Sequence, residues 1–345
     1  MKPDRINTPL PRPQHGLSLV ELMVAITLSL LLLAGVIQIY LGSKVTYRLQ
    51  EGLSRVQENG RFAMAFMTKD IRMTGYMGCA KLGVEGGVTP SIIVRDPPED
   101  VSFDLEDPIE VVVDDAGSGA TYGTRTLVEG SDVIKIRGAS PTAPTLTGNL
   151  SADNANIQIE SNPDNIEADD ILFITDCETA DIFVSTGVSE SSGKTTVAHA
   201  NSTNTTNRLS KAYQQDAMLM RFNSQSYFVA DTLRDNDTGS DIFALYRRND
   251  ITGTNEELIE GVQDMQVMYG VDNDGDGTAD EYVSEPSGGA ETVVSIRVAL
   301  LVNSVENASS ETPTYTDLSG TAVVAADRML RRTFQSTIGL RNRLP

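Results

Sequence analysis

The chain has 345 residues and a formal net charge of −21, with two histidines and two cysteines. A chain of this length can bury a large core. Its excess of carboxylates disfavours binding of bulk nucleic acid or of anionic membrane surfaces by the folded part. The two histidines leave few groups for imidazole-based catalysis. Composition therefore points away from nucleic-acid-binding proteins and from histidine-dependent hydrolases.

The first sixteen residues, 1–16, are rich in proline and basic residues and show no apolar periodicity, which is typical of a disposable leader. Residues 17–40 follow as an apolar run and are predicted to form a transmembrane helix. The stretch from Leu22 to Ile37 has no charge, and with the residues before it the run just spans a bilayer core roughly 30 Å thick. By the positive-inside rule the basic leader stays cytoplasmic, so the remainder is expected in the periplasm or outside.

One carboxylate, Glu21, lies near the start of this run. An acid at the centre of a spanning helix costs about 2.5–3.5 kcal/mol on insertion scales. Cleavage after Gly16 would place a new α-amino group on Leu17. This amine could pair with Glu21 of a neighbouring copy or sister subunit, because pairing offsets the cost of two charges in a membrane.

At these residues the sequence resembles the type IV pilin superfamily, whose precursors carry a glycine, a hydrophobic residue and then Ser/Thr-Leu-Val/Ile-Glu-Leu-Met/Leu. The matching residues are Gly16-Leu17-Ser18-Leu19-Val20-Glu21-Leu22-Met23. The resemblance implies cleavage between Gly16 and Leu17 by a prepilin peptidase, N-methylation of Leu17, and a role for Glu21 in subunit docking. The alternative is an ordinary signal anchor or signal peptide, but a cleavable apolar region is usually about 7–15 residues long and ends at an A-x-A-like site.

The helix is predicted to continue through residues 41–78 as an amphipathic segment. Its apolar positions recur mostly at steps of three and four, which is the helical period; they are Val45, Leu49, Leu53, Val56, Ala63, Met67 and Ile71. Gly60 is expected to weaken the middle by about 1 kcal/mol. Gly75 and Gly78 are expected to end the helix.

The remaining residues, 79–345, are predicted to form a β-rich periplasmic head. Short runs rich in β-branched residues alternate with turns rich in Gly, Asp, Asn and Pro, which favours antiparallel sheet. The expected strands are Ser91–Arg95, Ile109–Val113, Asp132–Arg137, Ile166–Thr175, Ile182–Ser185, Ala217–Phe222, Ser226–Ala230, Ile242–Arg247, Met265–Val271, Val293–Val302 and Arg332–Leu340. Three segments poor in large apolar residues are expected to be exposed loops: Asp115–Gly123, Ser140–Ala152 and Ser185–Asn207. The predicted fold class is α+β and pilin-like, with a long N-terminal helix packed on a large antiparallel sheet.

Several head segments are similar to the W-type minor pilins of type IV pili. They include Gly130–Ile134, Asp169–Cys177, Tyr227–Ala230, Leu245–Arg248, Leu258–Val267, Tyr269–Asp272 and Thr337–Arg343. The resemblance implies a non-enzymatic subunit that primes pilus assembly and so supports twitching motility. Its implied partners are other minor pilins, the major pilin, an adhesin-like tip protein and, before assembly, the inner membrane. Two alternatives remain: a J-type pseudopilin of type II secretion and a signal-anchored periplasmic enzyme.

The two cysteines, Cys79 and Cys177, fit an oxidising compartment, where an even number of cysteines usually means a disulfide. Such a bridge would close a loop of about a hundred residues, worth roughly 4–5 kcal/mol in the chain-entropy model. A metal-binding or catalytic thiol is the alternative. Neither cysteine belongs to a CxxC pair or lies beside a histidine, which favours the disulfide.

The acidic stretch Asp272–Asp280 is the one cluster in the head with the pattern of a metal site. Alternate carboxylates of a tight loop converge, and their hard oxygens suit Ca²⁺. The expected ligands are the side chains of Asp272, Asp274 and Asp276, the carbonyl of Thr278, and Asp280 directly or through water. Position twelve of an EF-hand is glutamate, whereas here it is Val283. The alternative is a solvated Asp-Gly hairpin turn without a metal.

Other catalytic constellations lack the necessary residues. His15 would leave with the leader, and His199 lies in a polar segment that is expected to be a loop. Paired carboxylates are expected to form a solvated face in so acidic a chain. Five C-terminal arginines, Arg328, Arg331, Arg332, Arg341 and Arg343, are expected to lie mainly on the outward face of a final strand, with a basic patch for DNA or an acidic subunit as the alternative.

Overall fold

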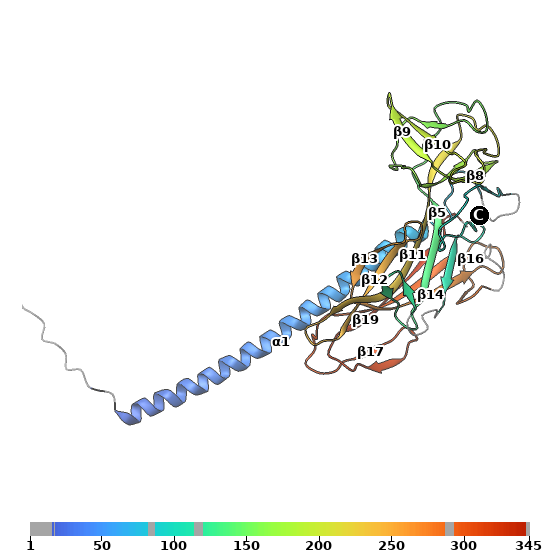
Figure 1. The fold of residues 1–345 in the computed structure, drawn as a ribbon. Helices are drawn as coiled ribbons and strands as arrows, with labels where there is room; N and C mark the ends of the chain where they lie inside the picture. Colours follow the sequence, from blue (N-terminus) through green and yellow to red (C-terminus); the bar gives the residue numbers. More distant parts are fainter. Residues whose placement is uncertain (1–15, 17, 82–86, 114–119, 287–292, 343–345) are drawn as a thin grey trace, which may run out of the picture. The chain divides into compact units, whose positions relative to one another are not determined.

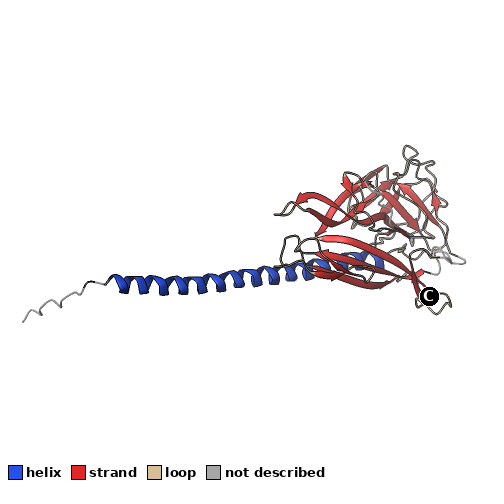
Figure 2. Ribbon diagram, turned by 90° about the horizontal axis from the view of Figure 1, so that it is seen from below, coloured by secondary structure: helices blue, strands red, loops and turns tan. Residues whose placement is uncertain are grey.

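The computed structural model describes residues 16, 18–81, 87–113, 120–286 and 293–342. Leu17 and most of the predicted leader, His15 included, lie outside the described residues, as does Arg343. Contacts divide the chain into two compact units, Met1–Gln50 and Glu51–Pro345. The described part contains one α-helix, α1 (Leu19–Arg72), and a head made of strands (Figures 1 and 2). The predicted α+β class with a long N-terminal helix is confirmed.

Helix α1 ends at Arg72, three residues before the first glycine of the predicted stop, Gly75. Beyond Arg72 the amides of Met73 and Thr74 donate to carbonyls three residues back, which tightens the last turn. Gly75 then takes a positive φ of 72°, a conformation that costs glycine little, and its amide donates to the carbonyl of Arg137 on a strand. The helix end is therefore tied directly to the head.

The buried face of α1 in the head consists of Gly52, Val56, Gly60, Ala63, Met67 and Ile71. It differs from the predicted stripe at its N-terminal end, because Val45 and Leu49 are exposed. Gly60 has a role that sequence analysis missed. A Cβ built on Gly60 would lie 2.3 Å from the ring of Phe334, so the glycine allows this ring to approach the helix backbone.

Nineteen strands are described, and sequence analysis missed several of them. Their bounds are β1 (Ser91–Ile92), β2 (Ile109–Val112), β3 (Thr121–Tyr122), β4 (Arg125–Thr126), β5 (Val133–Ala139), β6 (Ile157–Ile159), β7 (Ile171–Thr175), β8 (Ala180–Val184), β9 (Gly187–Ser191), β10 (Lys194–Ala198), β11 (Met218–Asp235), β12 (Asp241–Asn249), β13 (Thr254–Glu260), β14 (Val262–Val271), β15 (Glu281–Val283), β16 (Val293–Asn303), β17 (Thr314–Thr316), β18 (Ala322–Val324) and β19 (Arg331–Gly339).

The largest sheet has eight strands, ordered β1-β8-β7-β11-β12-β13, with β5 also pairing β11 and β2 pairing β5. Its pairs are antiparallel except β1 with β8, which are parallel. The two strands predicted at Ala217–Phe222 and Ser226–Ala230 are one 18-residue strand, β11. Figure 1 shows β5 and β11 running between the part of the head that holds β8, β9 and β10 and the part that holds β14 and β19.

A second sheet, ordered β15-β14-β16-β19, is antiparallel throughout. Side chains of both sheets and of α1 form one hydrophobic core. Ala63, Met67 and Ile71 supply the helix part, while residues such as Val298 and Tyr227 come from the two sheets. Packing of α1 against both sheets therefore forms the centre of the head.

A polar contact supplements this core. Asp70 of α1 accepts a hydrogen bond from the hydroxyl of Tyr227 and lies 3.4 Å from Nη1 of Arg247. Burial, and then the charge of Asp70, raise the pKa of Tyr227 far above its usual value, so this hydroxyl stays protonated as a donor. The contact joins the helix to β11 and β12.

The expectation that Ser185–Asn207 is an exposed loop is wrong. This segment contains β9 and β10, which form a three-stranded antiparallel sheet with β6. Val197 is fully buried, and the side chain of Asn204 is also buried because it bonds both backbone groups of Val184. The segment Ser140–Ala152 likewise buries Leu146, which bridges to Ile159.

The contact between Gly60 and Phe334 predicts an unusual response to substitution. Gly60→Ala removes a helix-weakening residue, a gain of about 1 kcal/mol, but it forces the ring aside at a typical overpacking cost of 1–3 kcal/mol. We expect net destabilisation in denaturant unfolding of the full chain. In a Phe334→Leu background the same substitution should become stabilising, because the clash is absent. Equal effects in both backgrounds would contradict the close-packing role.

Candidate functional site

The N-terminal unit is an apolar helix with no packing partner in the described chain. An 18-residue stretch of helix α1 has a mean hydropathy of 2.5 and contains no buried residue. The helix is therefore long and apolar enough to cross a membrane. Large side chains such as Leu31 and Leu32 are more than 70% exposed. A helix that is apolar on all sides is stable in lipid or against other apolar helices.

The first turn of α1 places Glu21 in a capping box. The amide of Glu21 donates to Oγ of Ser18 at 3.2 Å, and Oε2 of Glu21 lies 3.4 Å from the amide of Ser18. This reciprocal pair satisfies two amides that a helix start leaves without partners. Sequence analysis missed this role of Ser18, although the spacing S-x-x-E is its signature. Leu17, the predicted cleavage and methylation residue, lies outside the described residues.

The acidic loop connects β14 to β15 at the edge of the four-stranded sheet. Asp272, Asp274 and Asp276 each offer a carboxylate oxygen, and these oxygens lie within 4.8 Å of one another. Asp272 is nearly buried while the other two are exposed. The structure therefore brings together the three side chains that the alternating pattern predicts.

Backbone amides organise the loop around Asp272. Its Oδ1 accepts from the amide of Gly275 at 2.7 Å, and its Oδ2 accepts from the amide of Gly277 at 2.8 Å. These bonds lower the pKa of Asp272, and the bond from Gly277 has the largest effect. Gly275 and Gly277 have φ of 80° and 83°, which favours glycine at both positions. The ionised carboxylate and the tight turn thus stabilise each other.

Asp280 and Thr278, the other two predicted ligands, make hydrogen bonds within the loop. Asp280 is not part of the converging group, and its Oδ2 accepts from the amide of Asn273 at 2.8 Å. Thr278 donates its hydroxyl to Oδ1 of Asp276 at 2.5 Å. The position that is glutamate in an EF-hand is Val283, in strand β15. The arrangement is a hairpin loop with three convergent carboxylates, a set of hard oxygen donors that suits a cation such as Ca²⁺.

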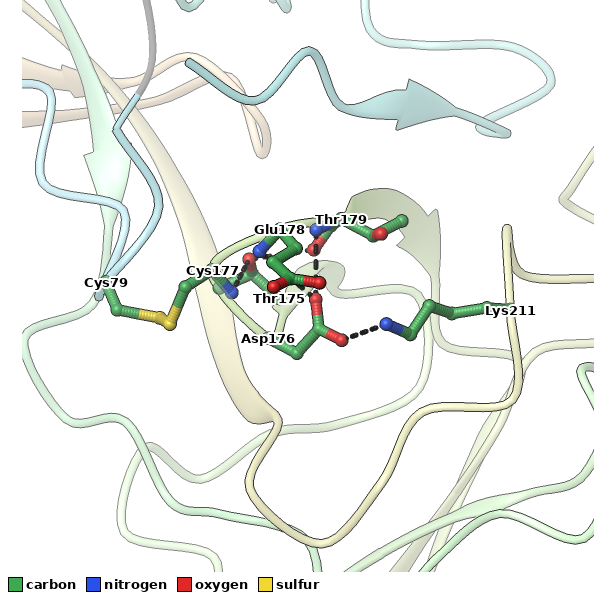
Figure 3. Close-up of a disulfide and its surroundings, with 7 residues drawn as sticks. All are labelled: Cys79, Thr175, Asp176, Cys177, Glu178, Thr179 and Lys211. Carbon is green, nitrogen blue, oxygen red and sulfur yellow. Dashed lines mark hydrogen bonds and ion pairs between the residues drawn. A yellow bond between two sulfur atoms is a disulfide. The ribbon is translucent and has the colours of Figure 1, made fainter. Parts of the chain in front are cut away.

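Cys79 and Cys177 form a disulfide with a Cα–Cα distance of 5.1 Å (Figure 3). Cys79 follows the end of α1, and Cys177 lies in the turn between β7 and β8. The same turn holds Asp176, whose Oδ1 accepts from the amide of Thr179 at 2.9 Å and whose other oxygen pairs with Lys211. Burial would raise the pKa of Asp176, but the bond from Lys211 and the backbone bonds outweigh it and lower the pKa. The disulfide therefore joins the helix end to a fixed turn.

The sequence predicted that His199 lies on an exposed loop, and this prediction is wrong. His199 is buried, its Nε2 lies 3.0 Å from the carbonyl oxygen of Ala155, and its ring meets Phe183 edge-on. These contacts are those of a core histidine. Among the C-terminal arginines, Arg331 pairs with Asp327 at 2.6 Å and is largely buried, whereas Arg328 and Arg332 are exposed.

Two family models match the chain. The prokaryotic N-terminal methylation motif matches residues 11–37, and type IV pilus-assembly protein W matches residues 226–342, about a third of the chain. The second match runs from within β11 to the residues after β19 and so includes the acidic loop. No curated protein and no solved structure gives a significant match.

The disulfide should contribute substantially to the stability of the head. Its cysteines are 98 residues apart, and the chain-entropy model assigns roughly 4–5 kcal/mol to a loop of this length. We expect the double variant Cys79→Ser/Cys177→Ser to unfold at clearly lower denaturant concentration. Wild-type protein under reducing conditions serves as the matched control and should behave alike. An unchanged midpoint in both would show that the bridge is dispensable.

Proposed function

We propose that this chain is a type IV pilin-like minor pilin, which both family matches support, that it primes assembly of a type IV pilus, and that it is not an enzyme. The main support is the order of its parts. A prepilin-type motif opens an apolar helix, and the same chain continues into a head whose C-terminal part, residues 226–342, matches type IV pilus-assembly protein W. This order suits a subunit that acts by assembly.

The proposed mechanism exchanges one environment of α1 for another. Before assembly the helix holds the subunit in the inner membrane, with its head in the periplasm. Entry into a filament or its tip replaces lipid contacts by contacts with helices of other subunits, which can stabilise an apolar helix equally well. Prepilin peptidase and other pilus components are the partners that the family implies; within this proposal they are sister minor pilins, the major pilin and an adhesin-like tip protein.

Glu21 has two possible partners in this mechanism. In the isolated chain its carboxylate lies against the amide of Ser18. After cleavage, the amine of Leu17 on a neighbouring subunit would offer a full positive charge, a stronger partner than a neutral amide. We propose that Glu21 exchanges the first contact for the second during docking. This role requires its charge, whereas capping requires only a hydrogen-bonding side chain.

The test separates these two roles by counting surface pili in a deletion strain complemented with variants. Glu21→Gln keeps a capping amide and removes the charge, so pili should be lost or reduced at least about tenfold, since a missing charge partner in lipid costs several kcal/mol. Ser18→Ala weakens the cap by about 1 kcal/mol and should leave pili near the wild-type number. Immunoblots must show equal amounts of processed subunit.

Normal pili with Glu21→Gln would reject the charge-pairing role. Normal pili in the deletion strain itself would reject the priming role and favour the secretion pseudopilin, which export of secreted enzymes would then reveal.

We also propose that the loop Asp272–Asp280 binds Ca²⁺. The convergence of three carboxylates within 4.8 Å supports this, because such acids repel one another unless a cation neutralises them. Asp272, Asp274 and Asp276 would supply side-chain oxygens, and Thr278 its carbonyl. Asp280, which lies outside the convergent group, would contribute only through water.

Calorimetric titration of the full chain with CaCl₂ tests this site. The double variant Asp274→Asn/Asp276→Asn retains side-chain acceptors but removes two charges, so calcium affinity should fall at least about tenfold. Asp235→Asn/Asp241→Asn removes the same charge from exposed positions paired between β11 and β12 and should bind normally. Absence of calcium-dependent heat in the wild-type chain would reject the site.

A further inference from the structure

A groove of about 750 Å³ lies along one face of α1, next to Pro141 of the head. Six of its lining residues, Arg61, Met64, Ala65, Thr68, Lys69 and Arg72, recur at steps of three and four and so form one face of the helix; Met73 and Pro141 close one end. All belong to the unit that contains the head. This face is turned away from the buried stripe at Ala63, Met67 and Ile71.

The floor and the rim of the groove differ in character. Met64 and Thr68 are half-buried and Ala65 is small and exposed, so a partner can approach the helix closely between them. An apolar floor of this kind along a helix is typical of a site that binds another helix.

The rim is positively charged. Arg61, Lys69 and Arg72 are exposed, and none has an ion pair with any residue that the structure describes. Arg247, by contrast, pairs with Asp70 and Glu256. These three cations stand out in a chain with net charge −21. Their spacing along α1 spans about 16 Å at 1.5 Å per residue.

A smaller pocket of about 220 Å³ continues the groove. It shares Lys69, Met73 and Pro141 with the groove and adds the amide side chains of Asn223 and Gln225 on β11. Amide groups can donate to or accept from a polar side chain. The surface as a whole is therefore an apolar track with cations along it and a polar pocket at one end.

We propose that this groove docks an acidic amphipathic helix of a different pilin-like subunit. Two helices pack with their axes 8–10 Å apart when the contact residues are small, as Ala65 and Thr68 are. Carboxylates along the edge of the partner helix would pair with the three cations, and its apolar stripe would cover Met64 and Ala65. The apolar floor favours such a helix over a nucleic-acid backbone or a lipid headgroup, which need charge alone. The inference rests on the proposed function, because the partner is taken to be a pilus component.

Site-specific photocrosslinking in living cells tests the groove with the full-length chain. A photoreactive residue replaces Ala65 in the groove or, as a control, exposed Ser191 on β9. We expect an adduct only from position 65, and mass spectrometry should identify a different pilin-like subunit in it. An adduct with a second copy of this chain, with lipid or with nucleic acid would overturn the proposal, as would no adduct.

Charge reversal tests the electrostatic part. Arg61→Glu/Lys69→Glu/Arg72→Glu should lower the adduct yield at least about tenfold. The control Lys194→Glu/Arg328→Glu/Arg332→Glu makes the same change of charge at three exposed cations elsewhere and should stay within about twofold of wild type. Both variants must be processed and form the disulfide, which shows that they fold. Equal yields from the two triple variants would overturn the role of the cations.

The result is distinguishable from failure of the proposed function. If pili disappear with Glu21→Gln but are normal with the groove variant, only the groove proposal fails. If the groove adduct forms while pili do not depend on this chain, the docking surface stands and the subunit serves another assembly.

Discussion

Packing of the last turns of α1 against the head is the interaction on which the other features depend. Gly52 and Gly60 let the helix approach the head closely, because a Cβ on Gly52 would overlap Ala308 of a loop and a Cβ on Gly60 would overlap Phe334 of β19. The same turns contribute to a core with both large sheets. Because one face is committed to this core, the opposite face with Arg61 and Arg72 stays available for a partner. A single helix thus divides its surface between folding and association.

Much of this organisation could be predicted from sequence. The spanning run, the continuation and end of α1, the α+β class and most strands follow from the period of apolar residues and from glycines. The strands that were missed lack this signal. Strand β13 lies at the edge of its sheet and pairs with β12, with ion pairs such as Arg247 with Glu256 between the two strands, and its acidic sequence shows no apolar alternation. Strand β10 contains two threonines, and Val197 is its one residue in a hydrophobic core cluster among the described residues, so its sequence shows no apolar alternation either.

The candidate sites also differ in how far the sequence predicts them. Local patterns predict the acidic loop, because alternate residues of a turn converge without help from the rest of the fold. Asp280, expected as a ligand directly or through water, lies outside the converging group, and its carboxylate accepts a hydrogen bond from the backbone amide of Asn273. The groove and the pocket that continues it could not be predicted, because Pro141 closes the groove and Gln225 lines the pocket from segments far from α1 in sequence. Tertiary neighbours of this kind leave no local periodicity.

The disulfide has a mechanical consequence for the proposed role in a filament. Tension applied to such a filament would enter the subunit through α1, and Cys79 is the first covalent branch point after that helix. From there the load can pass through sulfur directly to Cys177 beside β7. The segment between the cysteines, which contains β1 to β7, lies outside this covalent route and cannot be drawn out into extended chain. A pulled subunit would therefore lengthen far less than its number of residues suggests.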